Sequence, residues 1–83
     1  MLNSKKADRL KRLLYRSSHR GCKETDLVMG SFAEKNLSTL SEQELNTFEA
    51  LLEEQDWDVW NWLTGKEIPA AKYQPLIEMM KAY

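Results

Sequence analysis

The chain has 83 residues, enough for one small hydrophobic core but too few for two domains or a large enclosed active site. Hydrophobic residues make up 42% and charged residues 30%, a balance typical of a folded domain and not of a disordered segment. The formal net charge of −1 gives no overall excess of positive charge that would attract nucleic acid. We therefore expect a single domain over residues 1–83, with a flexible first few residues and no nucleic-acid partner.

Several kinds of site are excluded by the residues that the sequence lacks. Cys22 and His19 are the only cysteine and histidine, so neither an internal disulfide nor a Cys/His zinc cluster can form. No P-loop, GxGxxG, HExxH or GxSxG motif occurs. No apolar run approaches the roughly 18 residues of a membrane-spanning helix, and the N-terminus has no secretory signal. We expect a soluble, unexported protein without a bound metal or enzyme signatures.

Few residues interrupt helical patterns: the chain has three Gly and two Pro and is rich in Leu, Glu, Lys and Met, which predicts an all-α bundle. The first helix is basic and amphipathic and should end between residues 17 and 20, before Gly21. We interpret it as a structural helix and not a mitochondrial presequence, because Asp8 interrupts its basic charge. Its apolar positions are Ala7, Leu10, Leu13 and Leu14.

The second helix should run from near Cys22 to about Asn36, with carboxylates in its first turn, where they favour the positive end of the helix dipole. Its apolar positions are Leu27, Val28, Met29, Phe32 and Ala33. A short connector follows, whose leucines, Leu37 and Leu40, can fill the core.

The third helix has the sharpest predicted start. Ser41 and Glu44 have the spacing of a capping box, and Leu40 can pack against Leu45 as a hydrophobic staple. Its core side is expected to consist of Leu45, Phe48, Leu51 and Leu52, and its exposed acidic side of Glu42, Glu44, Glu49, Glu53 and Glu54. Because basic residues are concentrated before residue 24 and acidic ones after it, the charge distribution should orient a protein partner.

Two shorter helices complete the predicted fold. Asp56 or Asp58 is expected to cap a helix that ends at Gly65, and a last helix should run from about Pro75 to Ala82. Three tryptophans too close to share one helix face predict that Trp60 and one companion lie in the core while at least one is exposed; they are Trp57, Trp60 and Trp62. The remaining predicted core positions include Leu76, Ile77 and the methionines Met29, Met79 and Met80.

The candidate functional segment lies between the first two predicted helices. Gly21 is unfavourable inside a helix, so it indicates a turn or a close approach by another backbone. Arg20 offers a planar fork of donors and Glu24 an acceptor, and together they can grip a partner's carboxylate, carbonyls or amides. The alternative is a polar turn with a solvated ion pair of little consequence. Cys22, beside Lys23, is also a candidate reactive thiol.

The sequence Arg20-Gly21-Cys22-Lys23-Glu24 resembles the RGxxE motif of the succinate dehydrogenase assembly (flavinylation) factors of bacteria and mitochondria. The resemblance extends over most of the chain. It includes the segments Leu13-Leu14-Tyr15, Phe32-Ala33, Leu40-Ser41, Leu51-Leu52-Glu53 and Asp56-Trp57-Asp58-Val59-Trp60-Asn61-Trp62-Leu63.

The resemblance implies a five-helix bundle that binds the flavoprotein subunit of succinate dehydrogenase, or of fumarate reductase, as a monomer in a one-to-one complex. The factor would be no enzyme, but would help the client's own histidine to attack the 8α-methyl of FAD, and would hold no cofactor of its own. A bacterial cytoplasm is implied, or a mitochondrial matrix if the host is eukaryotic. The implied partner-binding residues are Arg20, Gly21 and Glu24, with Arg16, His19, Lys23 and Asp26 as neighbours.

Three other functions are compatible with parts of the sequence. A nucleic-acid-binding module would use the basic first helix, although no recognition helix follows it. An antitoxin-like or regulatory protein-binding module would dock on a different partner. A small helical enzyme fits least, because no nucleophile and base form a recognisable pair.

Overall fold

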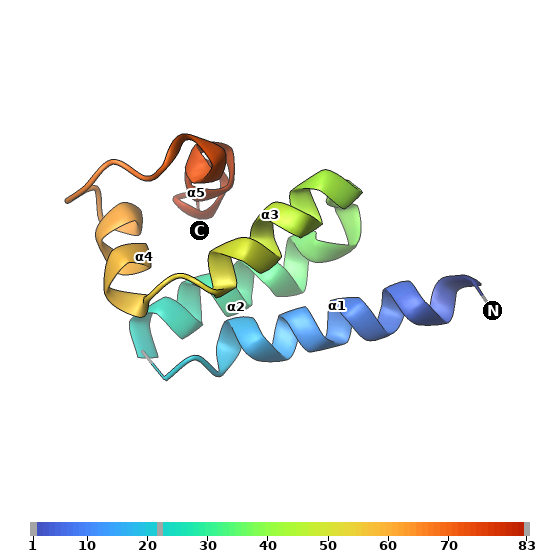
Figure 1. Ribbon diagram of the computed structural model, residues 1–83. Coiled ribbons are helices and arrows are strands. Elements are labelled where there is room, and N and C mark those ends of the chain that lie inside the picture. Colours follow the sequence, from blue (N-terminus) through green and yellow to red (C-terminus); the bar gives the residue numbers. More distant parts are fainter. Residues whose placement is uncertain (1, 22, 83) are drawn as a thin grey trace.

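The computed structural model describes residues 2–21 and 23–82, and every regular element within these ranges is helical (Figure 1). The prediction of an all-α, five-helix bundle is confirmed. The α-helices are α1 (Leu2–Ser18), α2 (Lys23–Asn36), α3 (Glu42–Leu52), α4 (Asp56–Leu63) and α5 (Gln74–Met80), with 3-10 turns η1 (Leu37–Thr39) and η2 (Ala71–Tyr73). Met1, within the N-terminal stretch expected to be flexible, lies outside the described residues, and α1 begins directly after it.

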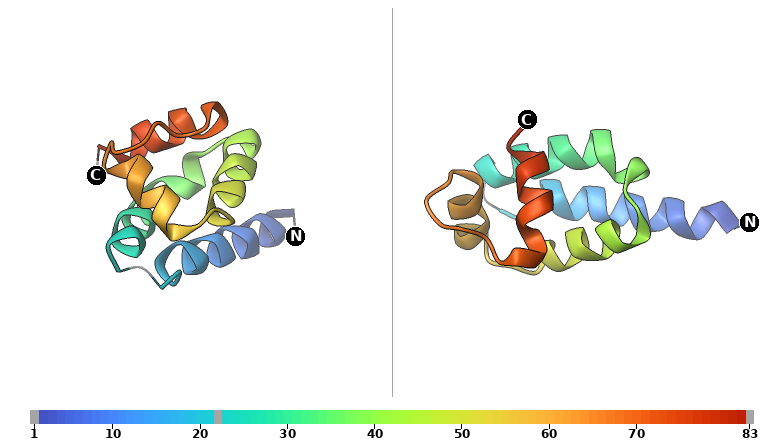
Figure 2. Two further views of the ribbon diagram at one scale, coloured as in Figure 1. Left: turned by 60° about the vertical axis from the view of Figure 1, so that its left-hand side comes forward. Right: turned by 90° about the horizontal axis from the view of Figure 1, so that it is seen from above.

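Helices α1 and α2 run side by side in opposite directions, and α3 lies beside them (Figure 1). The N-terminal turns of α1 project beyond the other helices, and α5 crosses over the bundle on the side away from α1 (Figure 2). The molecule is accordingly elongated, with principal extents of 44 × 25 × 21 Å. The short turn between α1 and α2 lies at the opposite end from the projecting helix, close to α4.

One hydrophobic core draws side chains from all five α-helices. Phe32 and Phe48 meet at its centre, with ring centroids 6.0 Å apart. The buried hydrophobic residues are Leu13, Met29, Phe32, Ala33, Leu37, Leu40, Leu45, Phe48, Leu51, Leu52, Val59, Tyr73, Leu76, Ile77 and Met80. Most were predicted from helical spacing, but three were assigned wrongly: Ala7, Leu27 and Met79 are exposed. The register that buries Met29 and Phe32 turns Leu27 outward, to 71% exposure.

The predicted capping box is present at the start of α3. The Ser41 hydroxyl accepts from the Glu44 amide at 3.1 Å, and the Glu44 carboxylate accepts from the Ser41 amide at 2.8 Å. Leu40 and Leu45 are both buried, as the predicted staple requires.

The predicted cap of α4 is wrong. Gln55 is the N-cap, without a side-chain cap bond, and Asp56 is the first residue of the helix. The Asp56 carboxylate instead forms an ion pair with Arg20, so a tertiary contact has replaced the expected local one. Gly65, with φ +81°, follows the end of α4 as expected.

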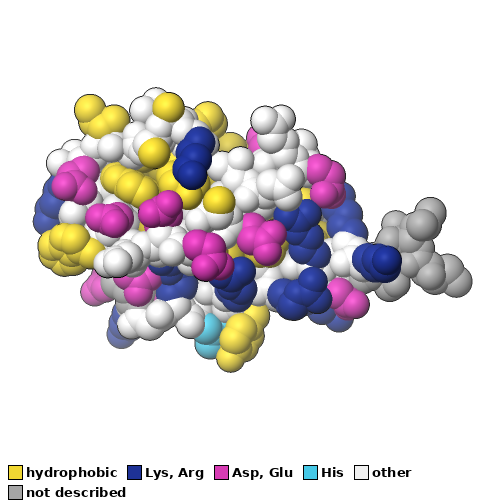
Figure 3. Space-filling view, in the orientation of Figure 1, with side chains coloured by type: hydrophobic (Ala, Val, Ile, Leu, Met, Phe, Trp, Pro, Cys, Tyr) yellow, Lys and Arg dark blue, Asp and Glu magenta, His cyan; other side chains and the backbone are white. Residues whose placement is uncertain are grey.

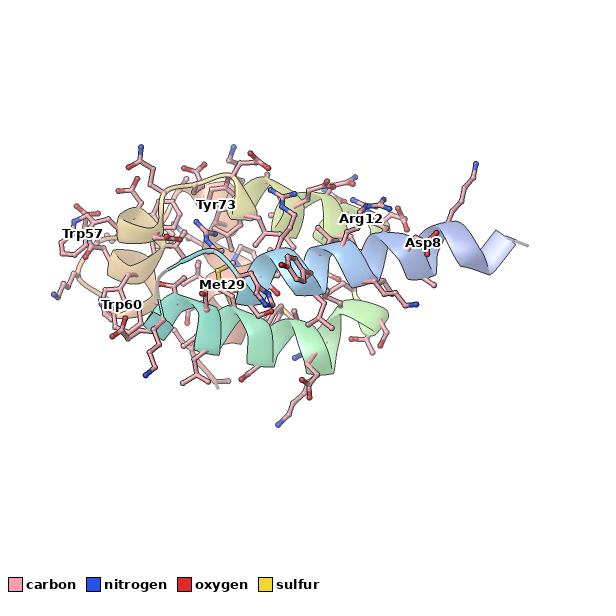
Figure 4. All side chains as sticks on the ribbon, turned by 90° about the horizontal axis from the view of Figure 1, so that it is seen from below. Asp8, Arg12, Met29, Trp57, Trp60 and Tyr73 are labelled. Atoms are coloured by element: carbon pink, nitrogen blue, oxygen red, sulfur yellow. The ribbon has the colours of Figure 1, made fainter. Side chains whose placement is uncertain are left out.

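The tryptophans divide differently from the expectation. Trp57 is 69% exposed, which confirms that at least one lies outside the core. Trp62 packs against the core and its ring lies 5.6 Å from that of Tyr73, whereas Trp60 is half-buried. Figure 4 shows Trp57 and Trp60 on the outer side of α4, while Met29 and Tyr73 lie toward the interior. The predicted anchoring role of Trp60 therefore belongs to Trp62.

The segregated charges of the sequence meet within the fold. Figure 3 shows basic side chains over α1 and acidic ones over α3 and α4. Arg9 Nη1 lies 3.1 Å from Glu42 Oε1, and Arg9 Nη2 lies 3.1 Å from Glu49 Oε1. Arg16 forms an ion pair with Glu53. Part of the charge that was expected to orient a partner therefore holds α1 against α3.

Candidate functional site

Gly21 lies in the turn between α1 and α2, with φ +112°. L-residues rarely adopt this conformation because their Cβ atoms clash with the backbone. A Cβ built on Gly21 would meet no atom within 4 Å among the described residues, and the residue is exposed. Gly21 was predicted to mark either a turn or a close approach by another backbone. Within this chain it marks a turn.

Asp26 fixes the backbone of this turn. It lies in the first turn of α2, and its Oδ1 accepts from the Arg20 amide at 2.9 Å while its Oδ2 accepts from the Gly21 amide at 3.2 Å. Both carboxylate oxygens are therefore used on consecutive amides. The side chain of Asp26 therefore stabilises the backbone conformation of the turn.

Arg20 points into the bundle, with only 8% of its side chain exposed. Its Nε donates to Asp56 Oδ1 at 2.6 Å, and its Nη1 lies 3.4 Å from the Leu51 carbonyl. Its Nη2 donates to the Glu54 carbonyl. The interpretation of Arg20 as an outward fork that grips a partner is therefore corrected: its guanidinium binds the junction between α3 and α4.

An aromatic pair lies beside the turn, formed by Tyr15 in the last turns of α1 and His19 just after that helix. The rings of Tyr15 and His19 are stacked, with centroids 3.9 Å apart and planes 8° apart, and both residues are exposed. His19 Nδ1 lies 2.8 Å from the Tyr15 carbonyl oxygen. This pair forms one wall of an open hollow of about 480 Å³. The hollow is lined by Tyr15, Arg16, His19, Arg20, Leu52, Glu54, Gln55 and Asp56.

Lys23 and Glu24 occupy the first turn of α2 and are exposed. A second open groove, of about 580 Å³, begins beside Lys23 and runs between α1 and α2 past the exposed Leu27 and the half-buried Gly30. The structure thus brings all the described predicted site residues to one turn with a hollow on either side. Cys22 lies outside the described residues, so the alternative of a reactive thiol at this variable position of the motif is not tested.

Four features of this region were missed by sequence reasoning. Asp56 is 36 residues from Arg20, and no local sequence pattern predicts an ion pair between residues so far apart. Gly30 allows α1 to approach α2, because a Cβ at this position would lie 3.0 Å from Ser18 Cβ. Leu27 was assigned to the core. The Tyr15–His19 stack has the i, i+4 spacing of neighbours on a helix surface, and that spacing was a usable signal.

The chemistry of the site suits recognition. Over residues 2–21 and 23–82, no three His, Cys, Asp or Glu side chains are grouped as a metal ion would need. No helix in the same ranges is long and apolar enough to cross a membrane. What the turn offers a binding partner is a fixed backbone conformation, exposed charges of both signs and an exposed aromatic pair.

Comparison with known proteins identifies the family. The family model described as "Flavinator of succinate dehydrogenase" matches residues 11–83, which include the turn and α2 to α5. "FAD assembly factor SdhE" of Acetobacter pasteurianus is 39% identical over 75 residues, covering 89% of this chain and 69% of that protein. "Succinate dehydrogenase assembly factor 2, mitochondrial" of Mycosarcoma maydis is 46% identical over 63 residues, covering 75% of this chain and 26% of that protein.

The mitochondrial relatives are longer than the matched region. The same-named protein of Cryptococcus neoformans is 36% identical over 74 residues, which is 87% of this chain but 42% of that protein. The chain thus spans less than half the length of these two fungal relatives. No solved structure matches the chain. Since the family model covers nearly the whole sequence, the chain belongs to the family of flavinators of succinate dehydrogenase.

Proposed function

We propose that this chain is an assembly factor that binds the flavoprotein subunit of succinate dehydrogenase and promotes covalent attachment of FAD to that subunit. The observation that carries the proposal is the family match over residues 11–83, which contains Arg20, Gly21 and Glu24 at the motif positions. The relatives' names, an assembly factor for succinate dehydrogenase and one for FAD, point to the same client and cofactor.

The partner-binding surface in this proposal is centred on the α1–α2 turn. Gly21 and Glu24 contribute exposed groups, whereas Arg20 and Asp26 contribute by holding the turn. It is flanked by the half-buried Arg16 near the end of α1, by the exposed His19 just after α1, and by the exposed Lys23 at the start of α2. A turn anchored by buried contacts binds with little loss of conformational entropy, which favours affinity for a protein partner.

The chemical step in this proposal belongs to the client. A histidine of the flavoprotein attacks the 8α-methyl of FAD, and this chain favours the client conformation in which the two groups are aligned. Alignment of reacting groups lowers a barrier without any added catalytic side chain, and a bound partner shifts a conformational equilibrium by its preference for one state. The chain is therefore a helper and not an enzyme.

We further propose that the chain holds no FAD of its own. Gly21, Gly30 and Gly65 are isolated glycines, and the sequence has no glycine-rich loop that would cradle a pyrophosphate. The complex would contain one copy of each protein, and the fumarate reductase flavoprotein is a second candidate client. The working compartment is that of the client: a bacterial cytoplasm, or a mitochondrial matrix if the host is eukaryotic.

The proposal is tested in cells that lack this protein, by in-gel flavin fluorescence of the succinate dehydrogenase flavoprotein. Fluorescence is expected to be lost in these cells, restored by the wild type, and not restored by Gly21→Arg. Glu24→Ala should restore the fluorescence weakly. Glu34 is an exposed carboxylate later on the same helix, and Glu34→Ala should restore the fluorescence fully. Normal flavin fluorescence in cells without the protein would overturn the proposal.

A further inference from the structure

The turn that carries Gly21 is fastened to the bundle at two points, and an aspartate forms each fastening. Asp26 binds the amides of Arg20 and Gly21, one with each carboxylate oxygen. A carboxylate offers two acceptor oxygens, whereas an amide side chain offers one acceptor and one donor group. Both oxygens are thus needed where two adjacent N–H groups must be satisfied.

The second fastening is the side chain of Arg20. Its side chain is 8% exposed, and its guanidinium contacts Asp56 at 2.6 Å together with the carbonyls of Leu51 and Glu54, at and just after the end of α3. A buried cation is stable only when its charge and its donors have partners. The turn therefore cannot move away from α3 and α4 without separating this ion pair.

We infer that Asp56 and Asp26 are positioning residues, which hold the Gly21 turn in the conformation that the flavoprotein binds. The inference rests on the proposed function and adds Asp56 to it, a residue outside the RGxxE motif that acts beside Asp26. Neither carboxylate needs to touch the partner: Asp26 acts on the turn's backbone and Asp56 acts through Arg20. Without either one, the turn samples other conformations, and ordering it again on binding weakens the complex.

The test compares Asp56→Asn with Asp58→Asn. Asp58 lies in the same first turn of α4 and is also half-buried, but none of its contacts within residues 2–21 and 23–82 is an ion pair. The readouts are the Gly21 amide resonance in ¹H–¹⁵N NMR spectra of the free protein and the Kd for the FAD-loaded flavoprotein subunit. Asp56→Asn should shift or broaden the Gly21 resonance, leave that of Gly65 in place, and raise Kd about tenfold.

Asp58→Asn should change neither readout, and Asp26→Asn should move both in the same direction as Asp56→Asn. The double variant Arg20→Met, Asp56→Leu tests the positioning role without loss of folding, because replacing a buried ion pair with hydrophobic side chains of similar volume often preserves stability. In this variant Tm should stay near the wild-type value while the Gly21 resonance remains displaced and Kd remains raised.

Two results would overturn the inference: a wild-type Gly21 resonance in Asp56→Asn, or wild-type affinity in the folded double variant. Failure of the wild-type protein to bind the flavoprotein would instead refute the proposed function. The two failures are distinguishable because the Gly21 resonance is recorded without the flavoprotein, so it still decides whether the two aspartates hold the turn.

Discussion

At the residue scale, position 21 favours glycine because its backbone adopts a positive φ. A side chain at φ +112° is strained even where space is available, so Gly21→Ala should lower the free energy of unfolding by about 1–2 kcal/mol. It should also weaken complementation of flavin attachment, because the turn relaxes toward another conformation. Urea denaturation and in-gel flavin fluorescence measure the two effects.

Gly65→Ala is the matched control for this prediction. Gly65 has φ +81° and the same open surroundings, but lies after α4 and outside the α1–α2 turn. Its replacement should cost a similar free energy of unfolding and leave flavin attachment intact. Equal losses of flavin attachment in the two variants would mean that overall stability, and not the turn, governs activity.

Tyr73 supplies a prediction that depends on pH. Burial, followed by the hydrogen bond from its hydroxyl to Glu54 at 2.8 Å and that carboxylate's charge, raises the pKa of Tyr73 from 10.0 to about 12. Because the raised pKa means that the folded protein binds this proton more tightly than the unfolded chain, the proton stabilises the fold, and this stabilisation is fully present below pH 10. Between about pH 10 and 12 the unfolded chain loses the proton while the folded protein keeps it, so stability falls by about 2–3 kcal/mol.

Tyr73→Phe removes the titrating group and keeps the aromatic ring beside Trp62. Urea denaturation at intervals from pH 9 to 12 should therefore show a shallower loss of stability in the variant than in the wild type. Parallel curves for the two proteins would show that the buried phenol does not govern this range.

At the scale of the elements, the spacing of apolar residues predicted the helices and most of the core. The capping box at Ser41 and the glycine after α4 are local patterns, and the structure contains both. The inward position of the Arg20 side chain was not predictable, because the oxygen atoms that it binds lie more than 30 residues away in the sequence and depend on how α4 docks. The same docking makes Gln55, not Asp56, the N-cap of α4.

Gly30 gives a prediction about the contact between α1 and α2. Its missing Cβ would lie 3.0 Å from Ser18 Cβ, which is fixed to the backbone of α1 and cannot move away alone. Gly30→Val should therefore separate the helices and lower the free energy of unfolding by about 1–3 kcal/mol, despite the better helix propensity of Val. Glu34→Val, at an exposed position on α2, should change stability little. Equal urea midpoints for Gly30→Val and the wild type would contradict this close approach.

At the scale of the whole molecule, the charge asymmetry of the sequence has two consequences. Arg9 and Arg16 pair with α3 and so contribute to the fold, whereas other basic residues of α1, among them Lys11 and Arg12, remain exposed.

The placement of the motif at one end of the molecule was not encoded in any local pattern, because it requires α1 and α2 to pack antiparallel. Membership of the family and the fold class were both predictable from sequence alone.

The most direct test of the central claim is flavin attachment with purified components. The succinate dehydrogenase flavoprotein subunit, prepared without covalent flavin, is incubated with FAD and with the wild-type chain, Gly21→Arg, or no addition, and covalent flavin is read by fluorescence after denaturing electrophoresis. We predict faster attachment with the wild type than with either of the other two. Equal rates in all three reactions would contradict the account.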